Sequence, residues 1–548
     1  MRPRVTALTF AGAVLVASLA CGDAVAATSY TRIDAQVPVD PGVSLDASLY
    51  VPNAPPPAGG FPLIVRQHGG GSNKDNPYDT LHGIHAVETG NYALLMYSHR
   101  GHGDSGGLFD FFGPQSVADF SKLLDWVAAT SRVHGLGIDT QNVGTNGYSQ
   151  GGGLSLLPAA FDSRVKVVAV GNTFDSLSHA LKPDGCYKLS WSTGVFAAAY
   201  KAAGARTDDL TALRWGLALA TDTEDVSTPL GPSASQELAA HSPLTYVHRL
   251  AAPFSDPHGS RSSVPVFWSN SWEDQLFPAD HPESILEALD DAGVATHYWF
   301  ASGGHAAGPD DPADVAAKEA AMLAWFDFHL RGVGTLPAAR VDYAERLPSG
   351  GWTHKTAADW PVPEAVARGL HPRADGTLAE SADSATAVGQ VVNDLANLNV
   401  ENDAILNEIA GNFPGGRDVL QSVPESGTPL DTRLYVSPVR ETAAEIVGAP
   451  ELRLAIRSTA VNRFQVSAKV FDVATDGTAR MINRGCVSLP AGTTEATLRL
   501  WPNAYVFAAG HRIALAISAV DFPVFAPDEE PQATTILSGT ELSLPTIP

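Results

Sequence analysis

A serine between glycines is the residue of this chain best suited to chemistry. Residues 147–151 read Gly-Tyr-Ser-Gln-Gly and follow a short apolar run that begins at Val143. A serine on a sharp turn between a strand and a helix projects its hydroxyl outward, and flanking glycines let the backbone bend tightly. The pattern therefore predicts that Ser149 is a nucleophile.

A base and an acid follow the serine in the order that such a nucleophile needs. A serine hydroxyl attacks a carbonyl only when an imidazole takes its proton and a carboxylate orients that imidazole. Asp274 follows the apolar run 264–268, and His305 follows the run 296–300 in a glycine-rich loop. We therefore expect His305 to be the base and Asp274 the acid, with Glu273, one residue earlier, as the rival acid.

Backbone donors for the oxyanion of acyl transfer are expected in a glycine cluster. The segment Gln67-His68-Gly69-Gly70-Gly71 follows a strand-like run over 61–66. Such a loop supplies N–H groups to a substrate oxygen, so we assign donors to Gly69 or Gly70 and to the N–H of Gln150. His68 is open to a role in shaping the loop, and a simple turn is the alternative for the glycines.

No motif predicts a metal or a cofactor. Residues 98–106 look like a phosphate-binding loop only superficially, because no Gly-Lys-Ser follows, and they are better explained as a tight structural turn. The histidines and acids show no paired spacing of the His-Glu-x-x-His kind. We expect a reaction that requires no metal.

Short apolar runs and helical patterns alternate around these residues. Such alternation predicts an α/β sheet covered on both faces, with a helix over 116–130. Before the sheet, residues 29–51 alternate like two strands around a Pro-Gly turn. The predicted core strands are 61–66, 92–98, 143–145, 165–170, 264–269 and 297–300.

The rest of the chain divides into an insertion and a strand-rich half. Residues 172–253 are mostly helical in pattern, notably 194–203 and 208–220, and predict a cap within a catalytic domain of residues 27–341. The last core helix is predicted over 313–330. Residues 342–548 predict a two-sheet β-sandwich, with 375–427 read as long loops apart from 391–398. The predicted sandwich strands include 433–435, 451–456, 464–471, 497–500 and 512–518.

Charge and the N-terminus restrict the partners and the compartment. A net charge of -24 opposes binding to nucleic acids and anionic membranes, and no later run is long and apolar enough to span a bilayer. Arg2 and Arg4, an apolar run over 5–20 and Ala-Val-Ala ending at Ala26 predict a signal peptide of residues 1–26 and export. A lipoprotein anchored through Cys21 is the less favoured alternative.

Two cysteines are left after that cleavage, Cys186 and Cys486. An exported chain meets an oxidising compartment, where the two are able to pair. Two buried free thiols are the alternative, and the sequence does not choose between them.

These motifs together resemble the cocaine esterase and X-prolyl dipeptidyl aminopeptidase family of serine hydrolases. The resemblance spans most of the mature chain, and it implies an α/β-hydrolase core with a helical cap followed by a galactose-binding-like, jelly-roll sandwich. In this family a tyrosine often follows the nucleophile and a tyrosine hydroxyl helps bind the oxyanion, whereas Gln150 and Gly69 occupy those places here. The motifs are 100–105 (Arg-Gly-His-Gly-Asp-Ser), Ser149, 241–244 (His-Ser-Pro-Leu), Asp274, His305, 500–505 (Leu-Trp-Pro-Asn-Ala-Tyr), 510–515 and 518–523.

We therefore expect a secreted hydrolase that cleaves carboxylic esters, with amides as a second class, through an acyl-Ser149 intermediate. The alternative enzyme is an X-Pro dipeptidyl-peptidase, which needs a carboxylate for the free amino terminus of its substrate. Asp184, Asp208 and Asp209 in the cap are candidates. The alternative of another class is a catalytically inactive secreted binding protein.

Overall fold

The computed structural model describes residues 29–189, 200–227, 232–305, 310–393, 431–522, 524–528 and 530–548. The predicted signal peptide lies outside the described residues. So does most of the helix predicted over 194–203, of which only α5 (Tyr200–Ala202) is described.

The N-terminal half is built on a twisted sheet that is parallel in its centre and antiparallel at both edges. Seven adjacent strands from β4 to β11 run parallel, while β1–β2–β4 at one edge and β11–β12 at the other pair antiparallel. The order across the sheet is β1 (Tyr30–Asp40), β2 (Val43–Pro52), β4 (Ala93–Tyr97), β3 (Phe61–Gln67), β5 (Ile138–Tyr148), β6 (Val165–Gly171), β9 (Val266–Ser271), β10 (Thr296–Ala301), β11 (Val341–Arg346) and β12 (Trp352–Ala357).

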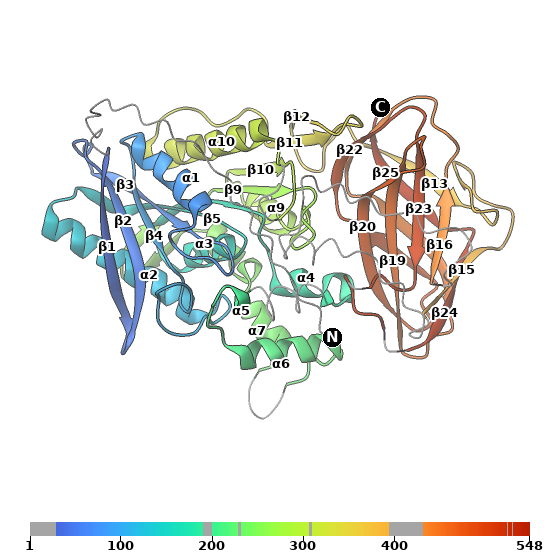
Figure 1. Ribbon diagram of the computed structural model, residues 1–548, viewed down its shortest axis with the longest axis horizontal. Helices are drawn as coiled ribbons and strands as arrows, with labels where there is room; N and C mark the ends of the chain where they lie inside the picture. Colours follow the sequence, from blue (N-terminus) through green and yellow to red (C-terminus); the bar gives the residue numbers. More distant parts are fainter. Residues whose placement is uncertain are drawn as a thin grey trace, which may run out of the picture.

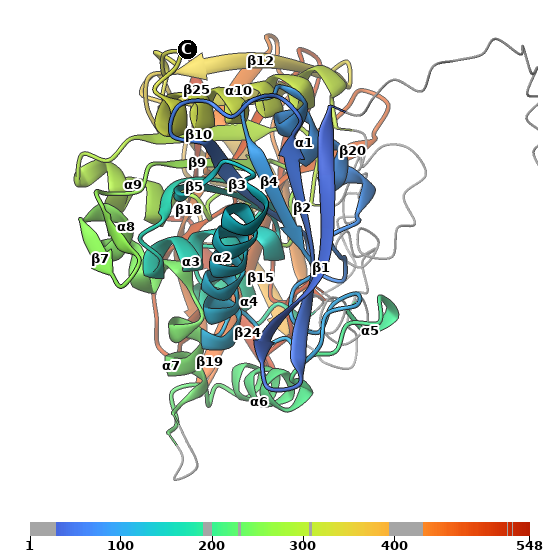
Figure 2. The same cartoon turned by 90° about the vertical axis from the view of Figure 1, so that its left-hand side faces the viewer.

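Helices cover both faces of this sheet, which explains why its central strands are continuous apolar runs. On one face α1 (Pro77–Glu88) and α10 (Pro312–Arg331) bury Val87, Met322 and Phe326 against the strands. The other face is covered by α2 (Pro114–His134), α3 (Gln150–Phe161) and α9 (Glu283–Asp291). Figures 1 and 2 show these two layers on opposite sides of the sheet.

A mostly helical segment is inserted between β6 and β9. Its helices pack Trp215, Leu219 and Leu238 against an aromatic cluster that includes Phe109 and Phe174. The segment therefore lies against the core rather than apart from it. Its elements are α4 (Leu177–Leu181), η1 (Pro183–Gly185), α5, α6 (Asp209–Ala220), α7 (Ala234–Ala240), η3 (Pro243–Tyr246), α8 (Val247–Ala251), β7 (Phe254–Asp256) and β8 (Gly259–Arg261).

The C-terminal half is all β in its described part. One sheet contains β16, β23, β19 and β20. The remaining strands belong to the sheet that contains β22, and β22 also pairs with β11 through Arg346 and Tyr505. Apolar side chains of both sheets, such as Leu454 and Ile517, bury a second core between them. The strands are β13 (Val366–Pro372), β14 (Leu378–Ala379), β15 (Ala387–Asn393), β16 (Thr432–Val436), β17 (Ala444–Gly448), β18 (Glu451–Ser458), β19 (Arg463–Val473), β20 (Ala479–Pro490), β21 (Glu495–Arg499), β22 (Asn503–Phe507), β23 (Arg512–Ser518), β24 (Gln532–Leu537) and β25 (Glu541–Ile547).

One stretch expected to form long loops contains strands instead. Residues 394–427, and with them most of the expected exception over 391–398, lie outside the described residues. Within 375–393, β14 pairs with β13, and β15 pairs with β24. The register of β15 shifts between Ala387 and Gly389, so its buried residues Val388 and Val391 do not alternate with period two. Because of this bulge, the apolar residues of β15 do not show the alternation typical of a strand. The sequence analysis therefore assigned its first residues to a loop and excepted only residues 391–398.

A disulfide joins the inserted segment to the C-terminal half. Cys186, just after η1, is bonded to Cys486 on β20, with 6.1 Å between their Cα atoms and a sequence separation of 300. The structure thus answers the question that the sequence left open. Within the described part of the chain, none of the helices is long and apolar enough to cross a membrane.

Candidate active site

Ser149 lies on a strained turn between β5 and α3. Its φ of 55° and ψ of -124° are unusual for a residue with a side chain, and its N–H donates to the carbonyl of Gly171 at 3.0 Å. A Cβ at Gly147 would collide with the backbone of Gly151, and one at Gly151 with the carbonyl of Gln67. The two glycines are therefore a packing requirement of the turn that exposes the serine hydroxyl.

His305 lies between Ser149 and Asp274. Its Nε2 is 2.9 Å from the Ser149 Oγ, and its Nδ1 is 2.8 Å from the Asp274 Oδ2. When Nδ1 carries the proton and donates it to the carboxylate, Nε2 is left to accept the serine O–H. The Asp274 side chain is fully buried and that of His305 is 14% exposed. The three residues come from the carboxyl ends of β5, β9 and β10, which lie at one edge of the sheet.

The acid turn distinguishes Asp274 from its neighbour. The Asp274 Oδ1 accepts the N–H groups of Leu276 at 2.8 Å and Phe277 at 2.9 Å, so Oδ2 faces His305. The Glu273 Oε1 lies instead 3.7 Å from a guanidinium nitrogen of Arg346. Of the two candidate acids, only Asp274 is brought to the imidazole.

Asn172 holds the histidine loop, although the sequence reasoning did not single it out. Its side chain donates to the carbonyl of Gly304 at 3.0 Å and accepts the N–H of Ser271 at 2.8 Å. It thereby ties the end of β9 to the residue before His305. It lies directly after β6 with a φ of 42°, a conformation that asparagine adopts more readily than most residues.

The predicted oxyanion loop borders the nucleophile. A Cβ at Gly69 would lie 3.9 Å from the Ser149 Cβ, whereas one at Gly70 would meet the hydroxyl of Tyr200. Gln150 is the first residue of α3, where a backbone N–H has no partner within the helix. Its side chain accepts the Tyr200 hydroxyl at 2.5 Å and donates to the His99 Nδ1 at 2.7 Å. The side chain of Gln150 is thus engaged with Tyr200 and His99, and its backbone N–H remains the oxyanion donor that the sequence predicts.

Buried histidines support this loop from behind. His68 Nε2 accepts the His99 N–H at 3.0 Å, which leaves Nδ1 to donate to the carbonyl of Gly69 at 2.7 Å. Burial, with the nearby His102, lowers the pKa of His68 to about 3, and burial lowers the pKa of His102 to about 4. These imidazoles are neutral near pH 7, and His68 shapes the loop as one reading of the sequence proposed.

The turn over 98–106 is closed by backbone hydrogen bonds, as its structural interpretation predicts. Gly101 N–H donates to the carbonyl of Gly106 at 2.9 Å, and Gly106 N–H donates to that of Ser44 at 2.8 Å. The Arg100 guanidinium pairs with Asp119 at 2.7 Å. The segment thereby fastens the start of the β4–α2 connection to β2 and to α2.

Two family models together match most of the chain. The model described as X-Pro dipeptidyl-peptidase (S15 family) matches residues 41–307, and the one described as X-Pro dipeptidyl-peptidase C-terminal non-catalytic domain matches residues 334–543. The chain belongs to the S15 family. The resemblance inferred from the motifs is thus confirmed.

Solved structures share the fold of this S15 chain over nearly its full length. An aminopeptidase from a marine sediment Thaumarchaeota archaeon is 16% identical, with a TM-score of 0.70, and the match covers 95% of this chain and 97% of that one. An α-amino acid ester hydrolase is 15% identical, with a TM-score of 0.70 and coverage of 96% and 98%. A CocE/NonD family hydrolase from Staphylococcus aureus is 14% identical, with a TM-score of 0.63 and coverage of 94% and 93%. No curated protein sequence matches the chain significantly.

The S15 chain is therefore a serine hydrolase with an α/β-hydrolase core and an all-β C-terminal half. Membership of an enzyme family removes the support for an inactive binding protein.

Proposed function

We propose that Ser149, His305 and Asp274 form a catalytic triad that hydrolyses carboxylic esters, with amides as the second substrate class. The observation that carries this proposal is the position of His305, within 2.9 Å of the serine hydroxyl and 2.8 Å of the carboxylate. That arrangement activates an otherwise weak nucleophile.

In the first half of the reaction, Ser149 Oγ attacks the carbonyl carbon while its proton passes to His305 Nε2. The N–H of Gln150 and that of Gly69 or Gly70 bind the oxyanion that forms. Asp274 stabilises the imidazolium. His305 then gives the proton to the leaving alkoxide, so the alcohol departs and an acyl-Ser149 ester is left.

In the second half, water replaces the alcohol. His305 takes a proton from the water as its oxygen attacks the acyl carbon, and the same oxyanion donors act again. The bond to Ser149 Oγ breaks, and His305 returns the proton to that oxygen. The products are a carboxylic acid and the free enzyme.

The placement of the cap acids favours esters over X-Pro peptides. Asp208 caps α6 and accepts the N–H and hydroxyl of Thr211, and Asp209 binds Lys201 and Thr207. Asp184 is exposed but interacts with His179 and Asp280, and partial desolvation raises its pKa. All three candidates for binding an amino terminus thus have neighbours of their own, so we place the peptidase second.

The proposal includes export and three regions. The disulfide between Cys186 and Cys486 supports an oxidising compartment, in keeping with removal of residues 1–26. We assign residues 27–341 to catalysis, with the cap over 172–253, and residues 342–548 to the C-terminal domain. The strand β11 begins at the proposed boundary. It pairs with β10 of the catalytic region and with β22 of the C-terminal domain.

A fluorophosphonate probe tests the nucleophile. We expect it to label the wild-type protein and to leave Ser149→Ala unlabelled, while Ser262→Ala, at an exposed serine, labels normally. Hydrolysis of a p-nitrophenyl ester should disappear with the same variant. Labelling that survives in Ser149→Ala, or none in folded wild type, contradicts the assignment. A higher kcat/KM for an Ala-Pro anilide than for short acyl esters would favour the peptidase.

A further inference from the structure

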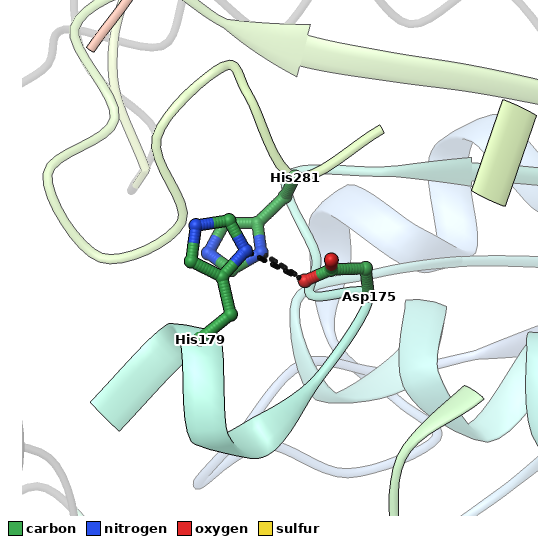
Figure 3. A group of neighbouring side chains, drawn as sticks. All are labelled: Asp175, His179 and His281. Carbon is green, nitrogen blue, oxygen red and sulfur yellow. Dashed lines mark hydrogen bonds and ion pairs between the residues drawn. The ribbon is translucent and has the colours of Figure 1, made fainter. Parts of the chain in front are cut away.

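Three side chains that the reaction does not use meet where the inserted segment contacts the core. Asp175 follows β6, His179 lies on α4, and His281 follows the acid turn (Figure 3). The Asp175 Oδ1 lies 3.0 Å from Nδ1 of His179 and 2.6 Å from Nδ1 of His281. The three atoms all lie within 4.8 Å of one another. Two imidazole nitrogens thus lie within hydrogen-bonding distance of the same carboxylate oxygen, and the three atoms form one compact cluster.

This donor set suits a cation of the zinc class. Imidazole and carboxylate ligands bind such ions at about 2.0–2.2 Å, which separates tetrahedral ligand atoms by about 3.4 Å. The separations of 3.0 and 2.6 Å need to widen by less than about 1 Å to admit an ion. Rotation of the partly exposed His179 side chain supplies part of this change.

A second carboxylate lies near the other ring nitrogen of His179. The His179 Nε2 lies 3.7 Å from the Asp280 Oδ2, on the opposite side of the ring from Asp175. Histidines that bind metals commonly direct their other ring nitrogen to a carboxylate in this way. Within the described residues, the Nε2 of His281 and the Oδ1 of Asp280 are buried with no hydrogen-bond partner. These two atoms are therefore polar groups near the cluster that its ion pairs do not engage.

We propose that Asp175, His179 and His281 bind one divalent cation of the zinc class. The ion fastens α4 of the inserted segment to the loop that leads from the acid turn to α9. Its role is structural, so the expectation that the reaction itself requires no metal is unaffected. Sequence spacing gave no sign of it, because the third ligand lies 106 residues after the first.

Metal content and thermal stability test the site without reference to activity. Full-length, tag-free protein is stripped with a chelator, dialysed, and incubated with one equivalent of Zn²⁺ before gel filtration. We expect elemental analysis to find about one zinc per chain and Tm to rise by several degrees. Co²⁺ in place of Zn²⁺ should give a visible absorption band of a nitrogen and oxygen site.

Two histidine variants make the result specific. His179→Gln, at a partly exposed side chain, should lose both the bound zinc and the rise in Tm, whereas His511→Gln should keep both. His511 is the matched control because its Nδ1 pairs with Asp472 at 2.9 Å on the distant β-half. Wild-type protein that neither retains zinc nor gains stability from it overturns the proposal, as does a His179→Gln variant that behaves like wild type. Failure of the esterase proposal would leave these readouts unchanged.

Discussion

Lys188 of the inserted segment donates a hydrogen bond of 2.9 Å to the carbonyl of Leu276. The N–H of the same Leu276 donates to the Asp274 carboxylate. Leu276 therefore links the Lys188 ammonium to the carboxylate of the proposed acid. The Lys188 ammonium also lies 5.0 Å from the centre of the Trp501 ring, and Arg484 reaches Gln275 at 3.3 Å. The acid turn is thus held jointly by the inserted segment and the C-terminal half.

Replacing Lys188 by methionine should reduce turnover more than stability. Burial lowers the pKa of Lys188 to about 7, so its charge is held at a cost and an apolar side chain of similar length should leave stability within about 1 kcal/mol. Loss of the bond to Leu276 loosens the acid turn, and we expect kcat to fall about tenfold with KM nearly unchanged. Steady-state kinetics and urea unfolding check both parts. An unchanged kcat would show that the turn keeps its position without the lysine.

Substitution of the acid should separate Asp274 from Glu273. Asp274→Asn removes the charge that orients His305 and stabilises its imidazolium, and kcat should fall by about 10⁴. Glu273→Gln, one residue away and directed at Arg346, should stay within about threefold of wild type. Ester hydrolysis by the two purified variants gives the answer. Equal losses in both would exclude the assignment of Asp274 as the sole acid.

The buried histidines should make the fold sensitive to acid. Burial lowers the folded-state pKa of His68 to about 3 and of His102 to about 4, and burial also lowers that of His99. As pH falls below about 6.5, these histidines bind protons in the unfolded chain but stay neutral in the folded chain. The stability that the neutral imidazoles contribute is therefore fully present above pH 6.5 and is lost as pH falls toward their folded-state pKa values of about 4 and 3. Each histidine contributes up to about 1.4 kcal/mol per pH unit.

Urea unfolding at several pH values between 7.5 and 4.5 measures this dependence. His102→Phe should reduce its slope, because one of the groups is removed and its unpartnered Nε2 makes an apolar replacement tolerable. His134→Asn, at an exposed histidine, is the control and should keep the slope of the wild type. A wild-type stability that is level down to pH 4.5 would be incompatible with buried neutral imidazoles.

Reduction should destabilise the wild-type protein through Cys186 and Cys486. The bond closes a very long loop, and loss of a native disulfide typically costs about 2–5 kcal/mol. We expect dithiothreitol to lower the wild-type Tm by several degrees and to leave the Tm of the double variant Cys186→Ser/Cys486→Ser unaffected. Differential scanning fluorimetry with and without reductant is sufficient. A double variant as stable as the oxidised wild type would mean that packing alone joins these parts.

Prediction from sequence worked best where local pattern and topology agree. An apolar run precedes each of Ser149, Asp274 and His305. Parallel strands bring the residues that follow them to one edge of the sheet, so the sequence predicts that these three side chains lie close together. The disulfide was left open because no local pattern reports the distance between residues 186 and 486. Asn172 and Lys188 were missed since each acts on a loop distant in sequence, through contacts that only the folded chain creates.

The bridge between Arg346 and Tyr505 means that the chain has no clean cutting point near its middle. A shortened protein that stopped at residue 341 would lose β11 and β12, leaving β10 with an uncovered row of amide groups that invites self-association. Engineers who seek a minimal catalyst from this scaffold should shorten its surface loops and keep both halves.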